Sequence, residues 1–379
     1  GNAPMDTNEV GSEVGAARAG CVTSKVHVDS NVGAASNVGA ASNVGAASNV
    51  GAASNVRVAS NVRVAMIGAG SMSNKVHYPS LASFEDVEIA AICDIDTGRL
   101  HTTADRYGVD RRYVDYRKMV EEVAPDAVYA IGQPHIFYDI WTWCLREGLN
   151  LYIEKPMGLS IHQARSLAHL AEQNGCITQV SFQRRSCPMV VKLREACLAR
   201  GPIVHAVCRF YKCAIDPYLE ARDHMMDDGV HAIDTLRWMC GGEVVSIHSI
   251  TRRVMVPDIN FFAVMLEFDN GATGLMVNSW TSGRRIFDVE MHAPGICVEA
   301  EHEGKGRLYA DGDTVGLEYD SREIAGGDEF FQYGGFQAKN REFIDCLKSG
   351  SQPGSHFGDA VKTMEVAEKI LAQLMLSGV

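Results

Sequence analysis

Three acidic residues and a histidine lie close together in the segment Asp227-Asp228-Gly229-Val230-His231-Ala232-Ile233-Asp234. If this segment opens a helix, Asp227 and His231 are four residues apart and share one face. A carboxylate that fixes the tautomer of an imidazole and stabilises its protonated form makes that imidazole a competent base near neutral pH. Such a base could take the hydroxyl proton of a secondary alcohol while hydride leaves the carbon. An ordinary helix start, with Asp227 or Asp228 as its cap and His231 packed, is the alternative.

A glycine-rich turn could bind the nucleotide that accepts the hydride. The apolar, β-branched run Val62–Ile67 is followed directly by Gly68-Ala69-Gly70-Ser71-Met72-Ser73 and then by a predicted helix. Gly68 permits a tight turn, Gly70 lets the backbone approach a pyrophosphate, and Ser73 is small enough to stand where a third glycine is usual. The N–H groups at the start of the helix would face the phosphates.

Asp94 follows the next predicted strand, Val87–Cys93, at the distance from the glycines that is typical of nucleotide-binding domains. At that place an acidic side chain accepts hydrogen bonds from the ribose hydroxyls of adenosine and repels a 2′-phosphate. NAD is therefore favoured over NADP, although the nearby Arg99 weakens the preference. A helix cap is the alternative role, because Asp94-Ile95-Asp96-Thr97 is also good capping sequence.

The elements around these residues predict a doubly wound α/β domain. Ala127–Ile131 and Leu149–Ile153 are further strand candidates, and Ile140–Glu147 between them is a helix candidate. Alternating strands and helices form a parallel sheet whose ligands lie at the carboxyl ends of the strands. The residues that would share this edge are Gly68, Asp94, Gln133 and Lys155.

Several strings of the chain together resemble one known family. They are IGAGSM with HYPSL behind it, AICDID, EKPMGLS, QVSFQRR and DDGVHAIDTLRW, and they extend from about Val62 toward the C-terminus. This combination is similar to the glucose-fructose oxidoreductase and inositol dehydrogenase family (Gfo/Idh/MocA). The resemblance implies an N-terminal Rossmann domain and a C-terminal α+β domain with a large, mostly antiparallel sheet.

The resemblance also implies a reaction and the residues that perform it. Lys155, Asp227 and His231 match the catalytic lysine, aspartate and histidine of the family, and the peptide between Lys155 and Pro156 is expected to be cis. The implied activity is hydride transfer between NAD and a secondary alcohol of a sugar, sugar derivative or cyclitol. The alternatives are an enzyme that retains NAD and uses transient oxidation for glycoside cleavage or epimerisation, and a non-catalytic nucleotide-binding protein. The predicted cofactor-binding residues are Gly68, Gly70, Ser71, Met72, Asp94, Gln133, Glu154 and Lys155.

Two places depart from the family pattern at the expected pocket wall. Phe137 stands where a histidine is common at the start of the helix before Glu154-Lys155-Pro156, and His135 lies two residues earlier. His224-Met225-Met226 replaces a glycine triplet that usually precedes the aspartate of the second motif. These changes affect the identity of the substrate more than the binding of the cofactor.

Consecutive strand signals after Gly201 predict the second domain. Ile259–Phe268 and Thr273–Trp280 flank the turn Asp269-Asn270-Gly271, which is a strong hairpin signal. Further strand candidates are Gly241–Arg253, Ile286–Glu301 and Arg307–Tyr319. One face of this sheet would carry the substrate pocket, and the other would join copies of the chain into a homo-oligomer, a dimer or tetramer. The predicted substrate-binding residues are Arg184, Arg185 and Trp280, with exposed arginines and a core tryptophan as the alternatives.

The expected division of the 379-residue chain is a tail at 1–60, a dinucleotide-binding domain at 61–186 and a substrate-binding domain at 187–379. The C-terminal helix is expected to pack back on the dinucleotide-binding domain. Four copies of one hexapeptide lie between Gly33 and Val56. Their small and polar side chains bury too little apolar surface to offset the entropy of ordering, so we expect a flexible tail that catalysis does not need.

Composition limits the partners of the chain. A net charge of −12 without a run of lysine or arginine argues against nucleic acid and anionic membranes, and leaves a small molecule. No stretch approaches the ~18 apolar residues of a membrane span, and the eleven cysteines are scattered without C-x-x-C pairs. Because no leader sequence is evident either, we expect a cytoplasmic protein. His224, Asp227 and His231 could gather on one helical face, but no further ligand is evident, so no metal is expected.

Overall fold

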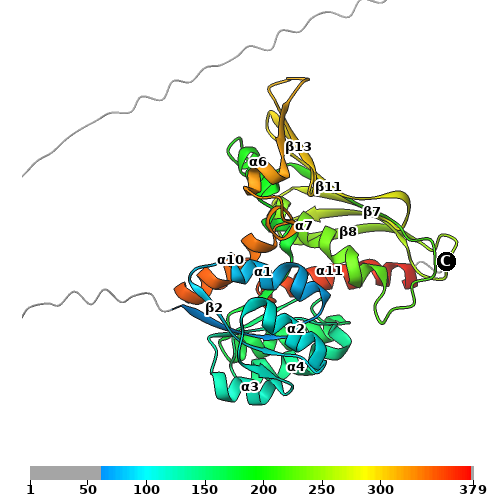
Figure 1. Cartoon of the computed structure of the whole chain (residues 1–379). Helices are drawn as coiled ribbons and strands as arrows, with labels where there is room; N and C mark the ends of the chain where they lie inside the picture. The colour runs from blue at the N-terminus through cyan, green and yellow to red at the C-terminus, as the bar shows by residue number, and fades with distance from the viewer. Residues whose placement is uncertain (1–60, 377–379) are drawn as a thin grey trace, which may run out of the picture. The chain divides into compact units, whose positions relative to one another are not determined.

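The computed structural model describes residues 61–376, which form two sheets with helices packed around them (Figure 1). The predicted tail at 1–60 lies outside the described residues. The first sheet has the strand order β3-β2-β1-β4-β5-β6, and all of its pairs are parallel. Its strands are β1 (Val62–Ile67), β2 (Val87–Cys93), β3 (Arg112–Tyr113), β4 (Ala127–Ala130), β5 (Leu151–Ile153) and β6 (Thr178–Val180).

Helices cover both faces of this parallel sheet. Along β1, Val64 and Met66 belong to one hydrophobic cluster while Ala65 and Ile67 belong to the other. A strand that is buried on both faces needs a nearly continuous apolar run, which explains the composition of β1. The helices of this half are η1 (Ser73–His77), α1 (Tyr78–Ala82), α2 (Thr97–Tyr107), α3 (Tyr116–Val123), α4 (Pro134–Arg146) and α5 (Ile161–Gln173).

The second sheet has eight strands in the order β14-β13-β12-β11-β7-β10-β9-β8, and only β7 and β10 pair in parallel. Together the two sheets confirm the predicted fold class. The strands of the second sheet are β7 (His205–Cys213), β8 (Val244–Arg252), β9 (Phe261–Phe268), β10 (Thr273–Ser279), β11 (Thr281–Ala293), β12 (Ile296–Glu301), β13 (Lys305–Ala310) and β14 (Leu317–Asp320).

Two C-terminal helices contact the parallel-sheet half of the chain. In Figure 1 the red helix α11 lies between the two sheets, and it packs against α5, where Glu365 accepts hydrogen bonds from Arg165. Helix α10 packs against η1 and α1. The helices of the second half are η2 (Gln183–Ser186), α6 (Pro188–Leu198), η3 (Met225–Gly229), α7 (Val230–Cys240), α8 (Ser321–Ala325), α9 (Phe330–Tyr333), α10 (Phe336–Ser349) and α11 (Phe357–Leu376).

Several predicted boundaries are wrong where a turn residue interrupts an apolar pattern. The single strand predicted over Ile286–Glu301 is two strands, because Pro294 and Gly295 form the turn between β11 and β12, with Gly295 at φ 71°. The strand predicted over Arg307–Tyr319 is likewise divided into β13 and β14. The helix predicted at Ile140 begins earlier, at Pro134.

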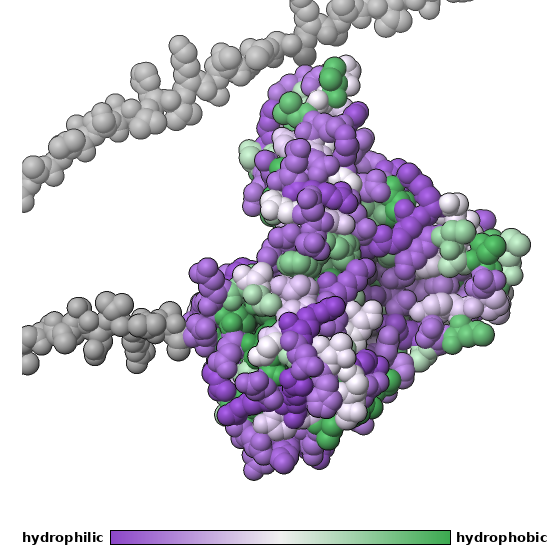
Figure 2. All heavy atoms as spheres, in the orientation of Figure 1, coloured by the Kyte–Doolittle hydropathy of each residue, from purple (hydrophilic) through white to green (hydrophobic). Residues whose placement is uncertain are grey.

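The described surface mixes hydrophilic and hydrophobic residues. On the face shown in Figure 2 hydrophilic residues prevail, and the hydrophobic ones lie in small groups between them. Between residues 61 and 376, no helix combines the length and the apolar character that crossing a membrane requires.

Candidate active site

The glycine turn after β1 leaves open space at the position where a pyrophosphate is expected. Gly68 has φ 105°, and a Cβ there would lie 2.2 Å from the carbonyl oxygen of Ile131, so a side chain is excluded. A Cβ at Gly70 would meet no atom within 4 Å. Ser71 is exposed and Met72 is half-buried at the start of the following helix. This turn therefore fits a dinucleotide, whose phosphates would face Gly70 and the free N–H groups of the helix start.

Asp94 is buried directly after β2 and holds the glycine turn. Its Oδ2 accepts from the Ala69 N–H at 2.8 Å, and its Oδ1 accepts from the Asp96 N–H at 2.8 Å and from Arg99 Nη2 at 3.1 Å. Asp96, not Asp94, caps helix α2 through a bond from the Arg99 N–H. The alternative role of Asp94 as a helix cap is therefore wrong, and its carboxylate lies beside the turn where a ribose is expected.

The strand end after β5 carries Glu154 and Lys155. Glu154 is buried, and its Oε1 lies 2.8 Å from Nε2 of His77 in helix η1. The peptide between Lys155 and Pro156 is cis, as the resemblance implied. Lys155 Nζ donates to the carbonyl oxygen of Asp227, so a lysine that follows β5 of the parallel sheet reaches η3, the turn directly before helix α7. The structure thus brings together two of the motifs predicted to share a site.

The predicted contact between Asp227 and His231 is not formed. Asp227 lies in the π-helical turn η3, and the wider turn changes which residues share a face with the α-helix that follows. Its carboxylate lies 2.6 Å from Arg222 Nη2, accepts from Tyr218 Oη at 2.8 Å, and lies 3.8 Å from Lys155 Nζ. Within residues 61–376 no hydrogen bond or ion pair joins this carboxylate to the His231 ring.

Asp228 and Lys212 form a second ion pair beside Lys155. Asp228 Oδ1 lies 3.7 Å from Lys155 Nζ, and its Oδ2 accepts from Lys212 Nζ. Burial alone would raise the pKa of Asp228, but the positive charges of Lys155 and Lys212 hold that pKa below its usual value. The sequence analysis missed Lys212. Its signal was the alternation along β7, which places Lys212 on the same face as the buried Cys208 and Phe210.

His231 is 5% exposed, and its Nδ1 has no hydrogen-bond partner among the described residues. Burial lowers its pKa well below the ordinary value, and the positive charges of Lys155 and Arg184 lower it further. The free imidazole is therefore neutral at physiological pH and able to accept a proton. It is a weaker base than the sequence analysis expected, because no carboxylate contacts it to stabilise its protonated form.

Trp280 forms the buried end of an aromatic stack that supports Asp227. Its ring stacks on His224 at 4.4 Å, and His224 in turn stacks on Tyr218 at 4.4 Å. Tyr218 then donates its hydroxyl hydrogen bond to Asp227. Trp280 is 2% exposed, so it acts on this site through the stack and not as an exposed wall.

Arg184 and Arg185 are both buried, so the alternative of exposed arginines is wrong, and they differ from one another in their partners. Arg185 donates to Asp234 at 2.8 Å, to the Gly354 carbonyl at 3.0 Å and to Asp359 at 3.1 Å. Each of its three nitrogens is engaged by the protein, which indicates a structural role. The guanidinium of Arg184 stacks 3.8 Å from the Phe287 ring centroid.

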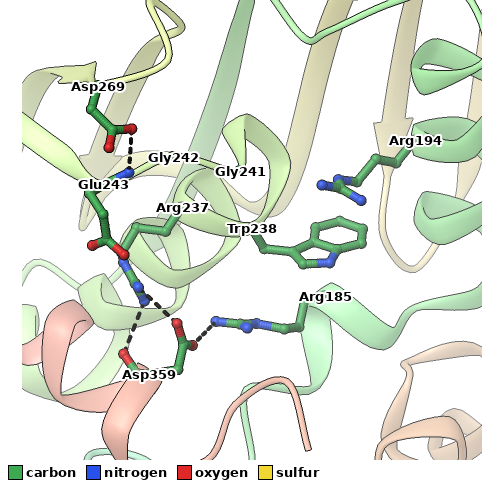
Figure 3. A pocket seen from close by; sticks show the side chains of 9 residues that line it. All are labelled: Arg185, Arg194, Arg237, Trp238, Gly241, Gly242, Glu243, Asp269 and Asp359. Atoms are coloured by element: carbon green, nitrogen blue, oxygen red, sulfur yellow. Dashed lines mark hydrogen bonds and ion pairs between the residues drawn. The ribbon is translucent and has the colours of Figure 1, made fainter.

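Two cavities of about 380 Å³ each lie around Arg185, Arg194 and Trp238, away from Lys155. Figure 3 shows the first of them, with Arg185 and Arg237 both directed at Asp359. Neither cavity includes Lys155, Asp227 or His231 in its lining. We therefore locate the candidate site from the charged contacts around Lys155 and not from these cavities.

Phe137 lies beside the glycine turn, with its ring 3.6 Å from the place of a Cβ at Gly68, and Gln133 lies at the start of the same helix, α4. Gln133 is exposed at the start of α4, where a cofactor could reach it. The Phe137 ring fills the space over Gly132, since a Cβ at Gly132 would lie 2.0 Å from it. Among residues 61–376 no group of three histidine, cysteine, aspartate or glutamate side chains is arranged to hold a metal ion.

Comparison with known proteins identifies the family. Residues 62–182 match the oxidoreductase family with an NAD-binding Rossmann fold (GFO/IDH/MocA), and residues 202–293 match the GFO/IDH/MocA C-terminal domain. The D-apiose dehydrogenase of Paraburkholderia graminis is 25% identical over 333 residues, which cover 80% of this chain and 85% of that protein. The D-glucoside 3-dehydrogenase of Escherichia coli is 26% identical over 187 residues, which cover 47% of this chain and 53% of that protein.

A solved structure shares the fold over most of the chain. A dehydrogenase from Chromobacterium violaceum has a TM-score of 0.76 at 18% identity, and the match covers 84% of this chain and 97% of that one. By contrast, the chain spans only about half of the length of the E. coli relative. With both family domains matched in order along one chain, this protein belongs to the GFO/IDH/MocA family of NAD-binding oxidoreductases.

Proposed function

We propose that this protein is an NAD-dependent dehydrogenase that oxidises a secondary alcohol of a sugar, sugar derivative or cyclitol. The observation that carries the proposal is the contact of Lys155 with Asp227 and Asp228 in η3, directly before helix α7. This contact joins the carboxyl edge of the nucleotide-binding sheet to the segment that carries His231. The names of relatives, which include D-apiose dehydrogenase and myo-inositol 2-dehydrogenase, support the class of substrate.

The residues divide the work of binding and proton transfer. Gly68, Gly70 and the helix start would hold the pyrophosphate, with Asp94 at the ribose. Nicotinamide, when bound, supplies the acceptor for hydride. The Lys155 ammonium would hold the reacting hydroxyl oxygen and stabilise negative charge that develops on it. The neutral imidazole of His231 would then take the hydroxyl proton.

Asp227 has a different role from the one expected from its spacing. Arg222 and Tyr218 fix its carboxylate 3.8 Å from Lys155 Nζ, and its carbonyl oxygen accepts a hydrogen bond from the same Nζ. We therefore assign Asp227 to the positioning of Lys155 and not to the orientation of His231. Asp228 and Lys212 complete the set of charges around Lys155.

The test compares the turnover and the NAD affinity of His231→Ala with those of the parent protein. General acid–base catalysis contributes about a hundredfold to ten-thousandfold, so His231→Ala should lose turnover by that factor. NAD affinity, measured by calorimetry, should change little in His231→Ala because the residue lies outside the glycine turn. A His231→Ala protein that oxidises a confirmed substrate at the parent rate would refute its role.

Product analysis with stoichiometric protein separates the proposed reaction from related chemistry. A dehydrogenase releases a ketone and NADH in equal amounts. Cleavage or epimerisation products without net NADH would show that the protein retains NAD. Nucleotide binding without any turnover would overturn the proposal of an enzyme.

A further inference from the structure

Arg184 is a buried cation that no carboxylate within residues 61–376 pairs with directly. It is 7% exposed, and within residues 61–376 its guanidinium forms no ion pair and no hydrogen bond, with Nε fully enclosed. It stacks against the rings of Phe287 and Phe210, with centroid distances of 3.8 and 5.2 Å. Burial lowers its pKa to about 10, which still leaves it charged at neutral pH. A buried charge without an opposite charge is costly, so this arrangement favours a ligand that supplies one.

Glu303 and Asp228 offset the charge of Arg184 only in part, because each of them is already paired with another cation. Asp228 is engaged by Lys155 and Lys212, and Glu303 is engaged by Arg285 at 3.0 Å. Arg184 and the ion pairs formed by Lys155, Lys212, Arg222 and Arg285 together contain more cations than carboxylates, although the whole chain carries a net charge of −12. The cations are Lys155, Arg184, Lys212, Arg222 and Arg285, and the carboxylates are Asp227, Asp228 and Glu303.

Arg184 and Lys212 lie against the same ring. Lys212 Nζ lies 5.3 Å from the centroid of the Phe210 ring, and the Arg184 guanidinium lies 5.2 Å from the same centroid. Lys212 pairs with Asp228, which in turn pairs with Lys155. The charges of Lys155, Arg184 and Lys212 all act on His231, so a ligand whose hydroxyl group contacts Lys155 and His231 lies in the field of two further cations. Arg185, next in the chain, is fully paired and offers no such site.

We propose that the substrate is an acidic sugar or polyol whose anionic group, a carboxylate or a phosphate ester, binds Arg184 and Lys212. This inference rests on the proposed function and narrows its substrate class. A guanidinium pairs well with either anion, because both present two oxygens to its N–H groups.

An anion at Arg184 would also assist proton transfer at His231. The positive charges of Lys155, Arg184 and Lys212 all oppose protonation of His231 in the free protein. A substrate anion beside Arg184 offsets part of this positive potential and makes the imidazole a stronger base. A neutral sugar bound at the same place would not make the His231 imidazole a stronger base. The acidic group should therefore improve turnover as well as binding.

The test uses matched ligands that differ only in the anionic group. Galactose, galacturonate and galactose 6-phosphate form one set, and glucose, glucuronate and glucose 6-phosphate form another. Binding to the full chain saturated with NADH is measured by calorimetry, and oxidation with NAD by NADH formation. We expect at least one acidic member to bind about tenfold to a hundredfold more tightly than its neutral counterpart, because a charge-assisted pair contributes that much. Comparing the uronate with the sugar phosphate in each set shows whether the site prefers a carboxylate or a phosphate ester.

Two arginine variants then test the assignment to Arg184. Arg184→Met should remove the preference for the acidic ligand, and Arg184→Lys should restore part of it. Arg194→Met is the matched control, since Arg194 also lacks an acidic partner among the described residues and stacks on an aromatic ring, 4.6 Å from Trp238 (Figure 3). Because Arg194 lines the cavities away from Lys155, this variant should keep the preference.

The outcomes separate failure of this inference from failure of the proposed function. If the neutral sugars bind at least as tightly as the acidic ones and are oxidised faster, the inference is overturned and the proposed function is left intact. A preference for acids that survives in Arg184→Met would overturn the assignment to Arg184. Loss of NADH affinity in Arg184→Met would assign the arginine to the cofactor instead. If none of these six ligands binds, the inference fails, and oxidation of a cyclitol then tests the proposed function by itself.

Discussion

At the scale of single residues, Asp94 is the group through which the choice between NAD and NADP can be changed. Its carboxylate accepts bonds from the Ala69 N–H and from Arg99, and Arg99 is half exposed. Asp94→Ser removes the charge that repels a 2′-phosphate and frees Arg99 to bind one. We expect the ratio of kcat/KM for NAD to that for NADP to fall about tenfold or more.

Asp96 supplies the matched control for this prediction. Its side chain caps α2, so Asp96→Ala should lower the free energy of unfolding by about 1 kcal/mol. Asp96 also pairs with Arg99 Nε at 3.8 Å, but this pair is exposed, and Asp94 keeps the charge that repels a 2′-phosphate. The cofactor ratio should therefore change much less in Asp96→Ala than in Asp94→Ser. A cofactor ratio that does not change in Asp94→Ser would show that the carboxylate does not contribute to the choice.

A second residue-scale prediction concerns pH and the buried His302. Neither ring nitrogen has a hydrogen-bond partner among the described residues, and burial lowers the pKa of this histidine to about 3, with the charge of Arg184 adding to the effect. The unfolded chain takes up a proton on this histidine below about pH 6.5, whereas the native state does not, so stability falls as the pH drops. Between about pH 7 and about pH 5.5 this loss is about 1 kcal/mol.

The variant His302→Leu should lose this part of the pH dependence. The free energy of unfolding, measured by urea titration at both pH values, should decrease less in the variant than in the parent by about 1 kcal/mol. His169→Leu, on the exposed side of α5, is the control for removal of a histidine. Parallel pH profiles of parent and His302→Leu would mean that His302 is not kept neutral by burial.

The sequence could predict which residues gather at the site but not every contact between them. Lys155 and the Asp227 segment meet as expected, since each motif follows or begins an element with a clear pattern. The predicted contact of Asp227 with His231 is wrong because a π-helical turn has no reliable signal in one sequence. Lys212 was missed because its partner Asp228 is distant in the chain and comes close only through the fold.

At the scale of elements, the turn between β1 and the helix that follows contains two glycines for which we predict different roles. Gly68 is needed for the fold of the turn, and Gly70 is needed for binding of the cofactor. A side chain at Gly68 would need φ 105° and a Cβ 2.2 Å from Ile131 O, so Gly68→Ala should lower the melting temperature strongly. Gly70→Ala meets no protein atom and should keep the parent melting temperature. We expect Gly70→Ala to weaken NAD binding by about tenfold or more, because its methyl group would occupy the approach of the pyrophosphate.

Calorimetry with NAD and thermal unfolding without it distinguish the two variants. The two glycines control for one another, since each receives the same methyl group. If Gly70→Ala binds NAD as well as the parent does, the phosphates do not approach the backbone at this position. The proposed location of the cofactor would then be incorrect.

Elements with a regular apolar pattern were predictable, and their ends were less so. β1 and β2 begin and end where the sequence analysis placed them, because each is a largely apolar run in which only Arg63 or Glu88 is charged. The strand predicted over Ile286–Glu301 failed at Pro294, where the alternation of side chains continues past a turn. The order of strands in the second sheet depends on contacts between distant segments, which no local pattern specifies.

At the scale of the whole molecule, the residues to which we assign chemical roles all lie after the repeats. The first of them is Gly68, and the described fold begins at 61 with β1 starting at Val62. A shortened chain that starts at Ser60 keeps all of β1. We expect it to bind NAD and to turn over substrate at the parent rate, as measured by calorimetry and NADH formation. A shortened protein that has native circular dichroism but weaker NAD binding would show that the repeats contribute to the cofactor site.

The central claim is that hydride passes from a substrate carbon to NAD beside Lys155 and His231. The most direct measurement follows deuterium from the carbinol carbon of labelled sugars and cyclitols into the nicotinamide, with stoichiometric protein and mass spectrometry of the cofactor. We predict that the parent protein transfers deuterium to the nicotinamide ring. In His231→Ala the initial rate of this transfer should fall by about a hundredfold or more. Consumption of a labelled substrate without any deuterium in the nicotinamide would contradict the claim.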